Sequence, residues 1–104
     1  MNNNQIRRKI IEELYKSNEE KPGVTTPHGI LRNKLGIEDN ELDRNINYLK
    51  EKGYIELITA MNYYAAKITH KGIDLLEDDN EFNTKFPLLN INQNIVKDST
   101  NVNI

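Results

Sequence analysis

The chain has 104 residues, of which 37% are apolar and 29% charged, and its formal net charge is −2. This length supplies a single hydrophobic core, and the near-neutral charge argues against a polyanion-binding surface spread over the whole molecule. The absence of cysteine excludes disulfides, thiolate metal sites and thiol nucleophiles. No apolar run approaches the roughly 20 residues that span a membrane, and no signal-peptide core is present, so we expect a soluble, cytoplasmic protein.

The first predicted helix begins at Asn4, a residue suited to cap it, and ends near Ser17. The polar segment 18 to 23 closes in Pro-Gly and predicts a loop, after which residues 24 to 25 are long enough only for a short strand. The apolar stripe of this helix consists of Ile6, Ile10, Ile11, Leu14 and Tyr15.

A second, short helix is predicted over residues 28 to 35. Thr26 is placed as its N-cap and Pro27 as its first helical residue, where the missing N–H costs nothing. Gly36 closes it, and a longer helix over residues 38 to 52 follows at once. Two helices joined by so tight a turn predict a helix-turn-helix from their spacing alone.

The helix predicted over residues 38 to 52 has one face to bury. Leu42, Ile46 and Leu49 are spaced at i, i+4 and i+7, which places them on one narrow stripe. Carboxylates in the first turn and lysines in the last complement the helix macrodipole. The opposite side carries Asn40, Arg44, Asn47 and Glu51, flanked by Glu41 and Tyr48.

A β-hairpin and another helix are predicted next. Residues 54 to 58 and 63 to 68 are β-branched and aromatic, and the break between them predicts a turn. Thr69 then serves as the N-cap of a helix that starts at His70.

The C-terminal part is less regular. The acidic run 77 to 81 is interpreted as a solvated face or a fraying helix end, and the apolar residues that follow could fold back on the core or meet a second chain. We assign residues 1 to 85 to one domain and residues 86 to 104 to an Asn-rich tail or linker that is expected to be disordered. The unclosed end at Ile104 leads us to expect a piece of a longer protein.

The order of these elements resembles a winged helix-turn-helix domain. Residues 35 to 37 resemble the turn of that motif. Residues 48 to 55 are similar to the run that ends the recognition helix and enters the wing in MarR-like and related prokaryotic transcriptional regulators, and residues 68 to 76 resemble the segment that leaves the wing. The resemblance covers about residues 5 to 80. It implies an α+β fold with a three-helix core, a two-stranded β-wing and a C-terminal helix.

The resemblance implies a DNA-binding protein whose recognition helix, residues 38 to 52, faces base edges in a major groove. Arg44 is chemically suited to guanine, and Asn40 and Asn47 are suited to adenine. Glu41 can accept a hydrogen bond from cytosine. Tyr48, and His28 with Thr26 at the start of the preceding helix, could hold phosphates. The residues expected to contact DNA are Thr26, His28, Asn40, Glu41, Arg44, Asn47, Tyr48, Asn62 and Lys67.

The charge of this helix departs from the family pattern. Carboxylates outnumber cations along it, and the predicted wing tip, residues 59 to 62, carries no lysine or arginine. Because such cations supply most non-specific affinity for duplex DNA, we expect binding to be weak. The alternative hypothesis is a protein–protein interaction module of a larger multidomain protein, with little or no DNA binding.

Two further alternatives concern single side chains. Arg44 could either contact a base or form a bridge to Glu41 or Tyr48 on its own helix. The tyrosines of the hairpin, Tyr54, Tyr63 and Tyr64, could stack on single strands or form part of the core.

Enzyme chemistry finds no support in the sequence. His28 and His70 are the only histidines, and no organised carboxylates accompany them, so neither a metal site nor a cofactor is expected. No Gly-rich phosphate loop or base-flanked nucleophile can be assembled. A homodimer is expected, through the first helix and residues 82 to 89, because both carry more apolar residues than a small domain needs.

Overall fold

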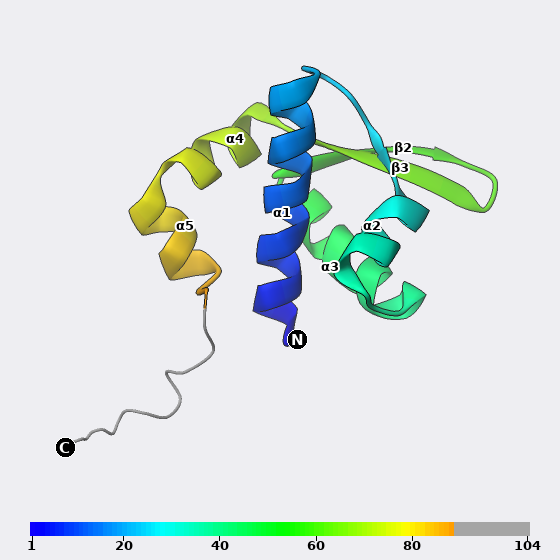
Figure 1. Cartoon of the computed structure of the whole chain (residues 1–104), viewed down its shortest axis with the longest axis horizontal. Helices are drawn as coiled ribbons and strands as arrows, with labels where there is room; N and C mark the ends of the chain where they lie inside the picture. The colour runs from blue at the N-terminus through cyan, green and yellow to red at the C-terminus, as the bar shows by residue number, and fades with distance from the viewer. Residues whose placement is uncertain (89–104) are drawn as a thin grey trace.

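The computed structural model describes residues 1–88. Helix α1 stands at the centre of the molecule, with α4 and α5 on one side of it and α2, α3 and the far end of the β-hairpin on the other (Figure 1). The predicted α+β architecture is confirmed. In chain order the elements are α1 (Asn3–Glu20), β1 (Thr26–Pro27), α2 (His28–Leu35), α3 (Asp39–Glu51), β2 (Ile55–Ala60), β3 (Tyr63–Ile68), α4 (His70–Glu77) and α5 (Asp79–Lys85).

The hydrophobic core is built around α1 and α3. Every aliphatic residue of the predicted α1 stripe is at most 2% exposed, and the three predicted core residues of α3 are buried to the same degree. The helical periodicity therefore identified the buried faces of both helices correctly. The buried residues of these two faces are Ile6, Ile10, Ile11, Leu14, Leu42, Ile46 and Leu49.

Helix α1 is longer than the sequence predicted at both ends. Its N-cap is Asn2, not Asn4, because Asn2 has a glutamine three positions on that completes a capping box. The Gln5 amide donates to Asn2 Oδ1, and the Asn2 amide donates to Gln5 Oε1, both at 2.9 Å. The helix also continues past Ser17, to Glu20, since the chain-breaking Pro-Gly pair comes only after Lys21.

The sheet has three strands in the order β1-β3-β2, all antiparallel. The prediction that Thr26 caps α2 is wrong, because Thr26 and Pro27 pair with Ala66 and Ala65 of β3 as an edge strand. Proline is tolerated at a sheet edge, where its missing N–H leaves no ladder bond unmade. The strand therefore lies two residues later than predicted, and α2 begins at His28.

The β2–β3 hairpin, called the wing below, is fastened to the body at its base. The Thr69 amide donates to the Tyr54 carbonyl at 3.1 Å, and the Thr69 hydroxyl donates to the Gly53 carbonyl at 2.6 Å. The same hydroxyl accepts from the Gly72 amide at 3.1 Å, which confirms Thr69 as the N-cap of α4. At this junction a Cβ on Gly72 would collide with the Tyr54 carbonyl oxygen and Ile68.

The acidic run 77 to 81 forms a helix junction rather than a frayed end. Asp78 ends α4 and caps α5, its side chain accepting from the Glu81 amide at 3.1 Å. The α5 segment then folds back on its own core, because Phe82 and Phe86 are 4% and 2% exposed. Phe86, which the sequence interpretation placed at the start of the tail, thus belongs to the packed structure.

Arg8 joins the last described turn to α1. Its Nη1 donates to the Phe86 carbonyl at 2.7 Å and to Asn83 Oδ1 at 2.8 Å, and its Nε pairs with Glu12 at 3.2 Å. Residues 89–104, which hold most of the predicted tail, lie outside the described residues. Within residues 1–88 no helix has both the length and the apolar character needed to cross a membrane.

Candidate nucleic-acid interface

The two helices of the predicted helix-turn-helix meet at Gly36. This residue has φ 67°, a left-handed conformation that ends α2, and its amide donates to the Arg32 carbonyl at 2.8 Å. The Arg32 guanidinium reaches across the turn to Asp39 Oδ1 at 2.9 Å. The start of α3 is therefore fixed to the end of α2, and part of its acidic charge is compensated there.

Glu41 helps to begin α3. Its carboxylate accepts from the Glu38 amide at 3.3 Å, and its backbone carbonyl accepts from Asn45 Nδ2 at 2.9 Å. Glu41 is also only partly exposed. In this arrangement its carboxylate satisfies a helix-terminal amide, which competes with the predicted contact to cytosine.

The outward side of α3 is as predicted. Asn40, Arg44 and Asn47 are all exposed, since the face that carries Leu42 and Ile46 is turned into the core. Asn47 Nδ2 contacts Glu51 Oε2 at 3.5 Å. Among residues 1–88, the side chains of Arg44 and Asn40 form no hydrogen bond or ion pair. The alternative of a bridge from Arg44 to Glu41 or Tyr48 is therefore not seen.

Asn45 is a buried polar residue that positions α3, and the sequence analysis did not identify it. It is fully buried, and its Oδ1 accepts from Arg7 Nε at 2.9 Å. Its Nδ2 donates to Asn3 Oδ1 at 3.1 Å and to the Glu41 carbonyl at 2.9 Å. A buried amide with these partners fixes the rotation of α3 against α1. Its position three residues after Leu42 could have revealed it, because i and i+3 lie on one helix face.

Two cations lie near the ring of Tyr48. The Arg7 guanidinium carbon is 3.5 Å from the ring centroid, and Lys52 Nζ is 5.5 Å from it. Contacts of this geometry hold a cation against the negative face of an aromatic ring. Tyr48 therefore gathers positive charge on the side of α3 that faces α1.

The opposite side of α3 contacts the wing through Tyr64. The Tyr64 hydroxyl donates to Asp43 Oδ1 at 2.9 Å, and its ring stacks on His28 with centroids 4.7 Å apart. Burial, together with the hydrogen bond to Asp43, raises the pKa of Tyr64 above its ordinary value of 10.0. Tyr64 therefore remains a hydrogen-bond donor at neutral pH. An open hollow of about 320 Å³ here is lined by His28, Asp39, Asp43, Asn62, Tyr63 and Tyr64.

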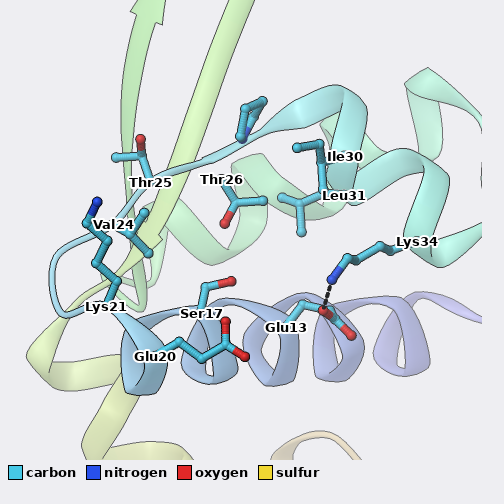
Figure 2. A pocket seen from close by; sticks show the side chains of 11 residues that line it. Glu13, Ser17, Glu20, Lys21, Val24, Thr25, Thr26, Ile30, Leu31 and Lys34 are labelled. Carbon is cyan, nitrogen blue, oxygen red and sulfur yellow. Dashed lines mark hydrogen bonds and ion pairs between the residues drawn. The ribbon is translucent and has the colours of Figure 1, made fainter.

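The remaining predicted contact residues are spread over the surface. Asn62 is exposed at the wing tip with φ 56°. Lys67 forms a cross-strand ion pair with Glu56 at 3.6 Å, so its charge is partly compensated. Thr26 lines a different hollow, of about 310 Å³, between α1 and α2, where Lys34 pairs with Glu13 (Figure 2). The structure thus brings His28 and Asn62 to one hollow and leaves Thr26 apart from it.

The distribution of ion pairs separates the cations into two groups. Arg8, Arg32, Lys34 and Lys67 each have a carboxylate oxygen within 3.6 Å. Within residues 1–88 the cations around Tyr48 have no such partner. In the same described part of the chain, no cluster of His, Cys, Asp and Glu has the form of a metal site.

A helix-turn-helix followed by an antiparallel wing defines a winged helix-turn-helix protein. The comparisons agree with this class. A MarR transcriptional regulator from Methanosarcina mazei Go1 has a similar crystal structure, with a TM-score of 0.60 and 20% sequence identity. The match covers 78% of this chain and 51% of the other, so this chain spans about half the length of that protein. At this identity the likeness establishes the fold. No family model and no curated protein matches the sequence.

Proposed function

We propose that this chain is the DNA-binding domain of a prokaryotic transcriptional regulator that acts in the cytoplasm. One observation carries the proposal: Asn40, Arg44 and Asn47 are exposed on the second helix of a helix-turn-helix whose opposite face is buried. Arginine and asparagine form the bidentate contacts that distinguish guanine and adenine in a major groove. In proteins that bind DNA with this motif, the second helix enters the major groove, which supports the proposal.

The other contacts of the interface follow from the same docking. The helix would enter the groove with its first turns, and the wing would lie beside it. The full set of proposed contact residues is Thr26, His28, Asn40, Glu41, Arg44, Asn47, Tyr48, Asn62 and Lys67.

Low affinity is part of the proposal. Asp43 carries a negative charge beside the wing, and Lys67 is paired, so the wing side adds little to phosphate binding. Each lost phosphate contact weakens binding and flattens its salt dependence. We therefore expect binding that is detectable at low ionic strength and disappears on addition of moderate salt.

A fluorescence-anisotropy titration with a mixed-sequence duplex at low salt tests the proposal. Arg44→Ala removes the central proposed reader and should weaken binding to duplexes selected by the wild-type chain by about 1–3 kcal/mol. Lys16→Ala removes the same charge from an exposed site on α1 and serves as the matched control. Undetectable wild-type binding, or equal effects of both substitutions, would contradict base reading by α3.

A protein-docking module is the second candidate function. The observation in its favour is the carboxylate pair Asp39 and Asp43 along the wing side of α3, next to exposed aromatic Tyr63. A surface of this kind suits a basic partner segment. A folded chain that binds no duplex at low salt, yet binds a Lys/Arg-rich peptide through Asp43, would support this candidate over DNA binding.

The proposed homodimer uses α1 and residues 82 to 89. Phe82, Phe86 and the aliphatic stripe of α1 are buried within their own chain. Among residues 82–88 this leaves Leu88, 64% exposed, as an apolar residue available for the contact. Sedimentation velocity of the full chain and of Leu88→Glu tests the contact. A monomer in both cases would remove the dimer from the proposal, and a dimer that dissociates only in the variant would support it.

A further inference from the structure

The exposed surface of α3 has a wing side with Asp39 and Asp43 and an α1 side with Arg44. Lys50, seven residues after Asp43, also lies toward the wing. Asp39 and Asp43 are four residues apart and therefore lie on one stripe, which faces the wing because Asp43 accepts from Tyr64. Arg44, Tyr48 and Lys52 are also spaced by four, and Tyr48 contacts α1 through Arg7. The two stripes thus face different neighbours.

Arg7 extends the positive stripe onto α1. Its Nε is held by Asn45 Oδ1 at 2.9 Å, and its Nη1 contacts Asn4 Oδ1 at 3.4 Å. These are neutral acceptors, so the charge of the guanidinium is not cancelled, and Nη2 has no hydrogen-bond partner among residues 1–88. The guanidinium is therefore held at the surface of Tyr48 with donors to spare.

Two carboxylates of α3, Glu41 and Glu51, lie beside this stripe, and each has a contact elsewhere. Glu51 Oε2 accepts from Asn47 Nδ2 at 3.5 Å. Glu41 lies toward the α1 side of α3, since its carbonyl accepts from Asn45, but its carboxylate is turned to the Glu38 amide at 3.3 Å. Across the helix, Asp39 pairs with Arg32. The cations around Tyr48 therefore have no carboxylate within ion-pair distance among residues 1–88.

We propose that this basic flank, made of Arg7, Arg44, Tyr48 and Lys52, binds one phosphate backbone of a DNA duplex. The inference rests on the proposed function and deepens it, because it states which side of the recognition helix carries the electrostatic contacts. Phosphate oxygens accept from arginine, lysine and tyrosine without regard to sequence, and such contacts set the position of a protein on the duplex. The DNA phosphate backbone on the α1 side is bound by these cations, whereas the wing side contributes little phosphate affinity.

Charge complementarity decides between the two sides. A phosphate backbone on the wing side would approach Asp43, which is fixed there by Tyr64, and would be repelled. On the α1 side it meets cations that are free of carboxylate partners among the described residues. Arg7 is preorganised by Asn45 and by the ring of Tyr48, so little side-chain entropy is lost when it binds.

The salt dependence of binding tests the inference. The full chain is titrated into a fluorescein-labelled, mixed-sequence duplex between about 50 and 200 mM salt, and the slope of log K against log salt is measured. Lys52→Gln should reduce the magnitude of the slope by about 0.9, and the double variant Arg7→Gln/Lys52→Gln by about twice as much. The double variant Lys9→Gln/Lys16→Gln loses the same charge from exposed positions of α1 and should leave the slope unchanged.

Two further measurements separate the possible failures. Arg7→Lys keeps the charge but loses the hydrogen bond from Nε to Asn45 and the guanidinium contact with the Tyr48 ring. It should therefore retain the salt slope even where thermal stability falls. Two results would contradict phosphate binding by the basic flank but leave the proposed function standing. One is wild-type binding with the same salt slope in the Lys52→Gln and Arg7→Gln/Lys52→Gln variants. The other is an equal change of slope in the Lys9→Gln/Lys16→Gln control. Absence of wild-type binding at the lowest salt would overturn the proposed function together with the basic flank.

Discussion

Replacing Gly72 by alanine should destabilise the fold at the junction between the wing and α4. The added Cβ would overlap the Tyr54 carbonyl oxygen and lie 2.7 Å from Ile68 Cγ1. The first of these is a backbone atom that cannot rotate away, and it also accepts the Thr69 amide at 3.1 Å, so the helix start must move. Gly72 is thus required for the close approach of two backbones.

The magnitude follows from two opposing contributions. Overpacking against fixed neighbours costs about 3 kcal/mol, and the higher helix propensity of alanine returns about 1 kcal/mol. The net loss of about 2 kcal/mol corresponds to a decrease in Tm of about 10 °C for a domain of this size. Urea unfolding followed by circular dichroism measures the free energy, and a temperature scan measures Tm.

Gly29→Ala is the matched control for this experiment. Gly29 lies in α2 with no atom within 4 Å of an added Cβ, so the same substitution should stabilise the protein by about 0.5 kcal/mol. The sign of the effect is therefore expected to differ between two helical glycines. Equal effects at both positions would refute the argument from close packing at Gly72.

Three other predictions concern the site and the core. Asn45→Ala should lower the unfolding free energy by about 1–3 kcal/mol, because it leaves Arg7 Nε without its acceptor, as urea unfolding would measure. The pKa of Tyr64 is higher in the folded chain than its ordinary value of 10.0, so its contribution to stability is complete below pH 10.0 and is lost as pH rises above it. Tyr64→Phe should flatten this alkaline decline in urea titrations at successive pH values. Phe86→Ala should cost about 3–5 kcal/mol, since Phe86 is 2% exposed; a change within error would place it outside the core.

Most of the correct predictions from the sequence came from helical periodicity. The spacing of Leu42, Ile46 and Leu49 identified the buried face of α3, and from it the exposure of Arg44 followed. Such a face depends only on residues within one helix, so a local pattern is sufficient to find it. The order of the elements then led to the winged-helix fold.

What could not be predicted depends on contacts between distant residues. Thr26 was interpreted as a helix cap because its local pattern fits one, but pairing with Ala66 of β3 makes it part of a strand. The spacing of Asn45 from Leu42 indicates that it lies on the buried face of α3, but its hydrogen bond to Arg7, 38 positions away, cannot be read from a local pattern. At Thr26, tertiary pairing overrode local propensity.

The contact between Arg8 and the Phe86 carbonyl brings together the two ends of the part of the chain that the structure describes, 78 positions apart. Met1 and Leu88 line the same surface hollow beside it. A fluorophore or fusion partner placed at either position would therefore start from one corner of the molecule, close to Gln5, Arg8 and Lys9. Closing so large a loop is slow compared with forming single helices, so this corner should be among the last regions to become ordered during folding.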